Sequence, residues 1–249
     1  MSYEGRARFV LIAGAIAILE LVCQAGAIAR TTMIPPTEMA AALFDILRSG
    51  KFTGHIIWTL RNIVVAAVLA MLAGFVIGVV LHAFPRVRRA LDPLFASYYA
   101  LPFFVFYPVL IVLLGLNELP IIALAFFLSV VAMILSTLNG IDRIPRVLNK
   151  VARVHRMRAW EAALIIKLPA AAPHLFSGAK LVVAYAFIGV IASEFILSGQ
   201  GVGYAIAYAY ENFDNRTMYG LMLLVIISVT LVNTVLHISE QRLLARRQR

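Results

Sequence analysis

The chain alternates between long apolar runs and short polar segments. Six apolar runs cover residues 9–29, 55–84, 94–116, 121–138, 175–197 and 218–238. Each is about long enough to cross a bilayer as a helix, because a helix rises about 1.5 Å per residue and the hydrocarbon core is about 30 Å thick. The pattern therefore predicts an all-α integral membrane protein with about six transmembrane helices.

The sequence also predicts a turn, a loop and a surface helix between these runs. Residues 85–93 form a short basic turn, and residues 198–217 form a glycine-containing loop. Thr37 is placed to cap an amphipathic helix whose apolar positions include Met39, Leu43, Ile46 and Leu47. Small residues in the second run, Ala73, Gly74 and Gly78, permit close helix packing.

The composition supports a membrane protein without a separate soluble domain. Of 249 residues, 62% are hydrophobic and 14% are charged. The longest mainly polar stretch has about thirty residues, so we expect a single transmembrane domain over residues 1–249. The segment Gly178-Ala179-Lys180 lacks the upstream glycine of a phosphate-binding loop, so a nucleotide site in this chain is not expected.

The basic residues predict the orientation of the chain in the membrane. The net charge is +10, but the basic residues lie in the gaps between apolar runs, which argues against a nucleic-acid partner. Six spans with both termini inside place 17 of the 22 Lys and Arg residues on the cytoplasmic side. This asymmetry follows the positive-inside rule and predicts a multi-pass protein with cytoplasmic termini.

The longest polar interruption is a basic segment at residues 142–173. Its composition favours a helix, with proline near both ends, at Pro145 and Pro169. We expect a short helix over residues 151–160 that presents Val154, Met157 and Trp160 beside several arginines. Such a surface needs either lipid headgroups or another protein as its partner.

Four residues within the apolar runs are candidates for lining a transport path. They are the carboxylates Glu20 and Glu194 and the third-run aromatics Phe103 and Tyr107. A carboxylate within a span is costly unless it is paired, so each glutamate faces either a polar path or a hydrogen-bonding helix. The aromatic residues serve either substrate contact or packing. Pro102 and Pro108 are expected to break this third run.

Several motifs resemble one family of transporters. Trp160 followed by Leu168-Pro169, together with Glu20 in the first run, resembles the binding-protein-dependent ABC importer permeases of the nitrate, taurine and aliphatic-sulfonate type. Further motifs that fit are Tyr107-Pro108 followed by Gly115-Leu116-Asn117-Glu118-Leu119, and Ile191-Ala192-Ser193-Glu194-Phe195 followed by Gly201-Val202-Gly203. The resemblance implies a non-enzymatic subunit of a bacterial inner membrane that moves a sulfonate, taurine, nitrate or bicarbonate-like anion.

The same resemblance implies the partners and the role of the basic segment. The segment would dock a separate ATPase through Arg153, Val154, Arg156, Met157, Arg158 and Trp160. The expected partners are two ATP-binding subunits, a periplasmic or lipid-anchored substrate-binding protein, a second permease copy or paralogue, and membrane lipid. ATP and Mg²⁺ would be bound by the ATPase, and no cofactor is expected in this chain.

The basic segment also departs from the family pattern. Aligned on Trp160, Lys150 stands where the family has glutamate and Arg156 stands where it has glycine. Either the turn forms without a permissive residue, or the helix continues through it.

A self-contained secondary transporter or channel is the alternative function. It would use Glu20 and Glu194 as intramembrane proton or ion sites. Six spans without an obvious inverted repeat weaken this alternative. An intramembrane enzyme would need a nucleophile–base pair or a set of metal ligands, and the sequence pattern offers no plausible example of either.

Overall fold

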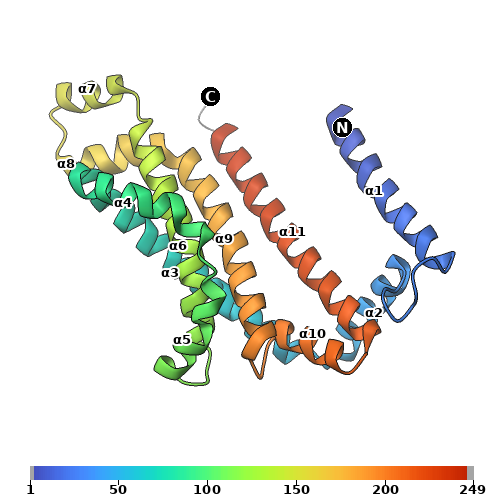
Figure 1. Ribbon diagram of the computed structural model, residues 1–249. Helices are drawn as coiled ribbons and strands as arrows, with labels where there is room; N and C mark the ends of the chain where they lie inside the picture. Colours follow the sequence, from blue (N-terminus) through green and yellow to red (C-terminus); the bar gives the residue numbers. More distant parts are fainter. Residues whose placement is uncertain (1–2, 246–249) are drawn as a thin grey trace. The chain divides into compact units, whose positions relative to one another are not determined.

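The computed structural model describes residues 3–245. Their order is α1 (Tyr3–Gln24), α2 (Pro36–Ser49), α3 (Thr53–Ala83), α4 (Pro85–Ser97), η1 (Tyr98–Ala100), η2 (Phe103–Phe106), α5 (Tyr107–Leu114), α6 (Leu119–Asp142), α7 (Arg146–Val154), α8 (Ala159–Ala162), η3 (Ala163–Lys167), α9 (Leu168–Leu197), α10 (Val202–Glu211) and α11 (Asn215–Ala245). Figure 1 shows these helices along the chain. The all-helical fold predicted from the sequence is confirmed.

The chain divides into two compact units. The first falls within residues 1–59 and 194–228, and the second within residues 60–193 and 229–249. Three basic residues of the tail, Arg246, Arg247 and Arg249, lie outside the described residues.

The predicted spans correspond to four long apolar helices, one bent pair of helices and one shorter apolar helix. Four helical segments are long and apolar enough to cross a membrane: Thr53–Ala83, Leu119–Asp142, Trp160–Ile196 and Asn215–Arg242. The third predicted span is a pair of helices, Pro85–Ala100 and Phe103–Leu114, that meet at a bend of 88°. The apolar part of the first predicted span is shorter, at Val10–Gln24.

The bend in the third span lies at Pro102. Pro102 lies between two 3₁₀ turns, η1 and η2. Pro108, by contrast, lies in the first turn of α5, where a missing N–H costs nothing. Pro102 therefore breaks the span as predicted, whereas Pro108 helps to start the next helix.

Helix α6 lies at the centre of the second unit, beside α3 and α9 (Figure 1). Gly74 and Gly78 of α3, and Gly178 and Gly189 of α9, all face it. A Cβ built on any of these four glycines would come within 2.5–2.7 Å of an α6 atom. The close packing predicted for Gly74 and Gly78 is confirmed, because only a hydrogen side chain leaves room for such contacts.

Ion pairs join helices of the second unit. Lys180 of α9 pairs with Glu240 of α11 at 2.5 Å, and the Glu240 side chain is only 10% exposed. Arg88 of α4 pairs with Asp142 at the end of α6 at 2.7 Å. The Lys180–Glu240 pair lies between apolar helices, where a lone charge would be costly.

Three boundaries differ from the sequence prediction. Residues 85–93 are not a turn but the start of α4, which Pro85 opens at a position where proline is favoured. Helix α9, which contains the predicted fifth span, begins at Leu168 rather than at residue 175, directly after the π-helical turn η3. The loop predicted at residues 198–217 contains a further helix, α10.

In the first unit, α2 packs against the start of α11. Its buried residues are Ala42, Leu43 and Ile46, while Leu47, another apolar position of this helix, is 55% exposed. A Cβ on Gly220 of α11 would lie 2.8 Å from the Ile46 Cδ1 atom. Because residue 220 is glycine, α2 and α11 can pack this closely.

Candidate functional site

The basic segment contains two short helices rather than the single helix predicted at residues 151–160. Helix α7 ends at Val154, and α8 begins at Ala159. The N–H of Arg156 donates to the Arg153 carbonyl, and the N–H of Met157 donates to the Ala152 carbonyl, both at 3.0 Å. These two bonds are those of a Schellman motif, which terminates a helix with one left-handed residue. The helix prediction was wrong because this turn ends α7 early.

Arg156 is the left-handed residue of this turn. Its φ is +49°, a region that glycine occupies freely and other residues enter at a cost of about 1–2 kcal/mol. Of the two possibilities left open by the sequence, the turn forms without a permissive residue. The two backbone hydrogen bonds of the motif offset the conformational cost.

Glu161 fixes the start of the second helix. Its carboxylate accepts a hydrogen bond from the Arg158 N–H at 2.8 Å. Arg158 precedes the first residue of α8, so Glu161 acts as the acidic half of a capping box. Sequence reasoning missed this role because an arginine, not Ser or Thr, occupies the cap position.

The side chains proposed to contact a partner are mostly exposed. Val154 is 80% exposed and Trp160 is 58% exposed, and Arg153, Arg156 and Arg158 are also exposed, while Met157 is half-buried. Because α7 begins earlier than predicted, Val147 and Val151 extend the same face at helical spacing. The structure thus presents an apolar surface beside arginines, which is suited to anchoring another protein.

We expect Arg156→Gly to stabilise this turn. Glycine removes the left-handed penalty, so local opening of the α7–α8 turn should become harder by about 1 kcal/mol. Hydrogen exchange at the amides of residues 156 and 157 would show this as slower exchange. Arg153→Gly is the matched control, because it places glycine inside α7 and should speed local exchange. Equal exchange in Arg156→Gly and the parent chain would contradict the assigned strain.

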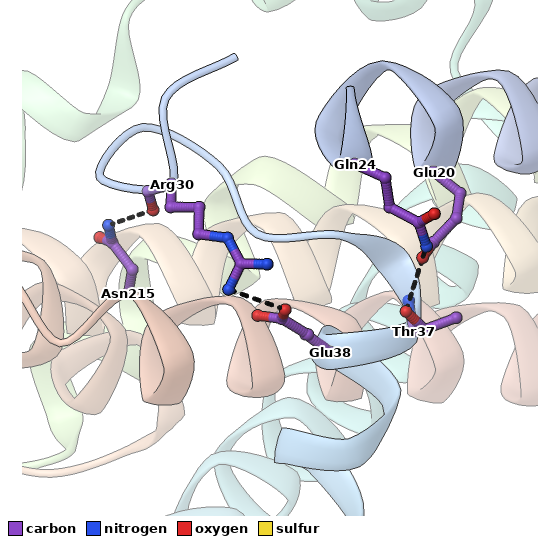
Figure 2. A network of polar contacts seen from close by, with 6 residues as sticks. All are labelled: Glu20, Gln24, Arg30, Thr37, Glu38 and Asn215. Carbon is purple, nitrogen blue, oxygen red and sulfur yellow. Dashed lines mark hydrogen bonds and ion pairs between the residues drawn. The ribbon is translucent and has the colours of Figure 1, made fainter. Parts of the chain in front are cut away.

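Glu20, a predicted path residue, joins α1 to α2 (Figure 2). Its carboxylate accepts hydrogen bonds from the Thr37 N–H at 3.0 Å and the Thr37 hydroxyl at 2.7 Å. The Gln24 amide donates to the same carboxylate at 2.6 Å. Thr37 is the second residue of α2, and the cap position is Pro35. The prediction of Thr37 as the cap was wrong: Glu20 supplies that function from another helix.

Neighbouring contacts tie the same connection to α11. Arg30 pairs with Glu38 of α2 at 3.3 Å, and the Asn215 amide donates to the Arg30 carbonyl at 3.4 Å (Figure 2). These bonds satisfy polar groups of the segment between α1 and α2, so contacts from α2 and α11 define its course.

Two replacements of Glu20 distinguish a role in capping α2 from a role in transport. Glu20→Gln keeps an oxygen acceptor for Thr37, and we expect α2 to remain intact, whereas Glu20→Leu leaves the donors of Thr37 without this acceptor. Hydrogen exchange at the first-turn amides of α2 should therefore rise in Glu20→Leu and change little in Glu20→Gln. A Glu20→Gln chain that assembles normally but loses transport would instead assign Glu20 to the path.

Glu194, the second carboxylate, is fully buried in the first unit. Its oxygens accept hydrogen bonds from the Thr59 hydroxyl at 2.8 and 3.0 Å and from the Gly203 N–H at 3.0 Å. The Thr59 oxygen in turn accepts from the Val202 N–H at 2.8 Å. The turn that precedes α10 is therefore wrapped around the Glu194 carboxylate.

Glu20 and Glu194 share one arrangement. Each lies near the end of an apolar helix and accepts a hydrogen bond from the second N–H of the next short helix and from a threonine hydroxyl. The cap positions of these short helices, Pro35 and Gly201, carry no side-chain acceptor. A carboxylate there satisfies an otherwise unpaired N–H and complements the positive helix end.

Phe103 and Tyr107, the aromatic path candidates, lie in the second unit. The Tyr107 side chain is 2% exposed and belongs to the core. The Phe103 ring lies 4.6 Å from the Tyr98 ring and lines an apolar cavity of about 250 Å³ with Phe106 and Phe127. The structure thus gives Tyr107 a packing contact and Phe103 a partly open surface, and their role in a path stays a prediction.

Comparison with known proteins places the chain in a family. Residues 66–249 match the family described as binding-protein-dependent transport system inner membrane component. The chain belongs to this family. The match includes the whole α7–α8 segment and α9, and α6, the central helix of the second unit, lies within it.

Individual relatives of this inner membrane component are similar over most of its length. It is 27% identical over 179 residues to the nitrate import permease protein NrtB of Leptolyngbya laminosa, covering 72% of this chain and 63% of the relative. It is 25% identical over 230 residues to the putative aliphatic sulfonates transport permease protein SsuC of Bacillus subtilis strain 168, covering 92% and 83%. The chain thus spans less than two thirds of the length of NrtB.

Solved structures share the fold. A chain of the inward-facing MetNI methionine ABC transporter matches with a TM-score of 0.65 at 18% identity, covering 77% of this chain and 95% of that chain. A second crystal form of MetNI gives a TM-score of 0.64 at 19% identity. These matches establish a common architecture for the inner membrane component.

Proposed function

We propose that this chain is the permease subunit of an ABC importer that moves a small anion across a bacterial inner membrane. The observation that carries the proposal is the exposed apolar face of α7 and α8 beside arginines, within the region matched to the family. The face fits an external protein, and the ATP-hydrolysing subunit of the importer is the partner that the family assignment favours. This ATPase would bind ATP and Mg²⁺.

The relatives support a small anion as the solute. NrtB is named for nitrate, SsuC for aliphatic sulfonates and CmpB of Synechococcus elongatus for bicarbonate. The solute of this chain is accordingly a nitrate, sulfonate, taurine or bicarbonate-like anion that a substrate-binding protein delivers from outside.

A mechanical connection supports the coupling role of the segment. Trp160 begins a helical segment that continues through η3 and α9 to Ile196. A force applied to α8 therefore passes along one continuous helical path to the neighbourhood of Glu194. Rigid helices transmit such forces as tilts rather than as local deformation.

The assembly has two permease copies, or one copy with a paralogue, and two ATPase subunits on the side of α7 and α8. The charge asymmetry of the sequence puts that side and both termini in the cytoplasm. The substrate-binding protein, periplasmic or lipid-anchored, docks on the opposite side.

Co-purification tests this function. The tagged full chain is co-expressed with phosphate-loop ATPases from the same genome, and the detergent-solubilised membranes are purified through the tag. The expected result is a stable complex that hydrolyses ATP, whereas the purified chain alone shows no hydrolysis. Recovery of the chain without the ATPase, or uptake of an anion by the chain alone in liposomes, would overturn the proposal.

A further inference from the structure

A cavity of about 250 Å³ lies within the first unit, between the start of α3 and one face of α10. Lys51, Phe52 and His55 line it from the α3 side, and Tyr204 and Tyr208 line it from α10. None of these residues takes part in the α7–α8 surface. The charge asymmetry of the sequence puts this cavity on the outer side of the membrane.

Aromatic rings form a continuous wall of the cavity. The ring centroids of Phe52 and His55 are 6.1 Å apart, those of His55 and Tyr204 are 6.0 Å apart, and those of Tyr204 and Tyr208 are 6.1 Å apart. The four rings come from rigid helices or directly precede one, so the wall is preorganised. Such a surface favours a planar or short apolar group.

The polar groups of the cavity are mainly hydrogen-bond donors. The exposed Lys51 ammonium lies 5.5 Å from the centroid of the Phe52 ring. His55 accepts the Gly201 N–H at Nδ1, at 3.1 Å, so its neutral ring carries the proton on Nε2. The two tyrosine hydroxyls add further donors.

The acceptors in the lining are already engaged in part. One oxygen of the Asp214 carboxylate accepts the Thr217 N–H at 3.1 Å, and Asp214 thereby complements the positive end of α11. Asn212 also lies in the lining, and it uses its amide N–H, a donor, on the Tyr208 carbonyl at 2.7 Å. The lining therefore offers the Lys51 ammonium and the His55 Nε2–H as donors, and its one carboxylate, Asp214, is already engaged at the start of α11.

We propose that this cavity binds a small organic anion, a sulfonate or carboxylate with a planar or short apolar body. The acidic group is held by Lys51 and the Nε2–H of His55, and the body lies against Tyr204 and Tyr208. The inference rests on the proposed function only in identifying this anion with the transported solute. The binding chemistry itself follows from the lining.

The site is connected to the turn around Glu194. His55 holds the Gly201 N–H, and Gly203, two residues later, donates to the Glu194 carboxylate. An anion bound to the Nε2–H would hold the same His55 ring whose Nδ1 accepts the Gly201 N–H. Occupancy of the cavity and order of the turn are expected to rise together.

Ligand-observed NMR with the full chain in nanodiscs of neutral lipid tests the site. Benzenesulfonate and ethanesulfonate serve as anionic probes. Benzyltrimethylammonium, which carries the same phenyl ring as benzenesulfonate but a positive charge, serves as the control. Benzenesulfonate is expected to bind the parent chain more tightly than either of the other two probes. Lys51→Met should weaken its binding about fivefold or more, because a charge-assisted hydrogen bond is lost. Tyr208→Leu should weaken benzenesulfonate more than ethanesulfonate.

Matched variants separate a specific site from surface charge. Arg48→Met removes an exposed cation outside the cavity lining and should leave binding within about twofold. Lys51→Arg should retain binding within a similar range. Equal affinity of Lys51→Met and the parent chain, preference for benzyltrimethylammonium, or no benzenesulfonate binding would each overturn the proposal. Because no ATPase or uptake is involved, any of these outcomes leaves the proposed importer function standing.

Discussion

Replacement of Met157 and Trp160 by alanine together is expected to reduce ATP-driven uptake at least tenfold, while the chain still inserts and folds. Trp160 is 58% exposed, and Met157 lies in the turn that separates α7 from α8. Large side chains at an interface centre commonly contribute about 2 kcal/mol or more to binding, which corresponds to roughly thirtyfold in affinity. If the proposed ATPase docks on α7 and α8, uptake should fall because this surface no longer holds it.

Two measurements distinguish loss of coupling from loss of folding. Uptake and ATP hydrolysis are measured in the same proteoliposomes, and the expected result is that hydrolysis loses its dependence on transport. Arg156→Glu should act in the same direction, because it reverses an exposed charge beside the apolar face.

Leu116→Ala is the matched control for this effect. Leu116 is 84% exposed, and it lies between α5 and α6 rather than in the α7–α8 segment. It should leave uptake unchanged although it also removes a large exposed apolar side chain. Normal coupled uptake by the Met157 and Trp160 variant would overturn the docking assignment.

The second large effect is expected from Gly201→Ala, which should destabilise the turn between α9 and α10 by about 3–5 kcal/mol. Gly201 has φ of +106°, a conformation that a residue with a Cβ rarely adopts. A Cβ at this position would lie 2.1 Å from the Glu194 carboxyl carbon. Glu194 cannot move away cheaply, because it is buried and accepts hydrogen bonds from Thr59 and Gly203.

Thermal unfolding of the purified chain, followed at one fixed scan rate, measures this effect. Gly199→Ala supplies the control, since a Cβ there meets nothing within 4 Å and should change stability by less than about 0.5 kcal/mol. Thr59→Val removes the hydroxyl that binds Glu194 and should lower stability in the same direction as Gly201→Ala. Similar unfolding midpoints for Gly201→Ala and Gly199→Ala would contradict the packing around Glu194.

The spans and the family could be predicted from the sequence because both depend on residues that are close together in the chain. The apolar runs follow from the cost of exposing backbone and polar groups to lipid, which acts on every residue in the same way. The motifs around Trp160 and Glu194 pointed to the importer permeases, and the family match over residues 66–249 confirms that assignment.

The helix boundaries within the polar segments could not be predicted as well from the sequence. The run of helix-favouring residues at 151–160 predicted one helix, yet two backbone hydrogen bonds and a left-handed Arg156 divide it. Residues 85–93 and 202–211 are helical, although proline, arginine or glycine in their sequence suggested turns. Intrinsic preferences are small, so a few tertiary contacts or capping bonds reverse them.

The sequence by itself determined the apolar runs, the family motifs and the place of the longest basic segment, and its charge asymmetry predicts the orientation. Only the tertiary structure decided what Glu20 and Glu194 bind, because their partners Thr37 and Thr59 lie 17 and 135 residues away along the chain. The cavity beside His55 depended on the fold for the same reason, since α3 and α10 are far apart in sequence. Hydrophobicity acts residue by residue, whereas a hydrogen-bonded carboxylate or a lined cavity exists only once distant helices are packed together.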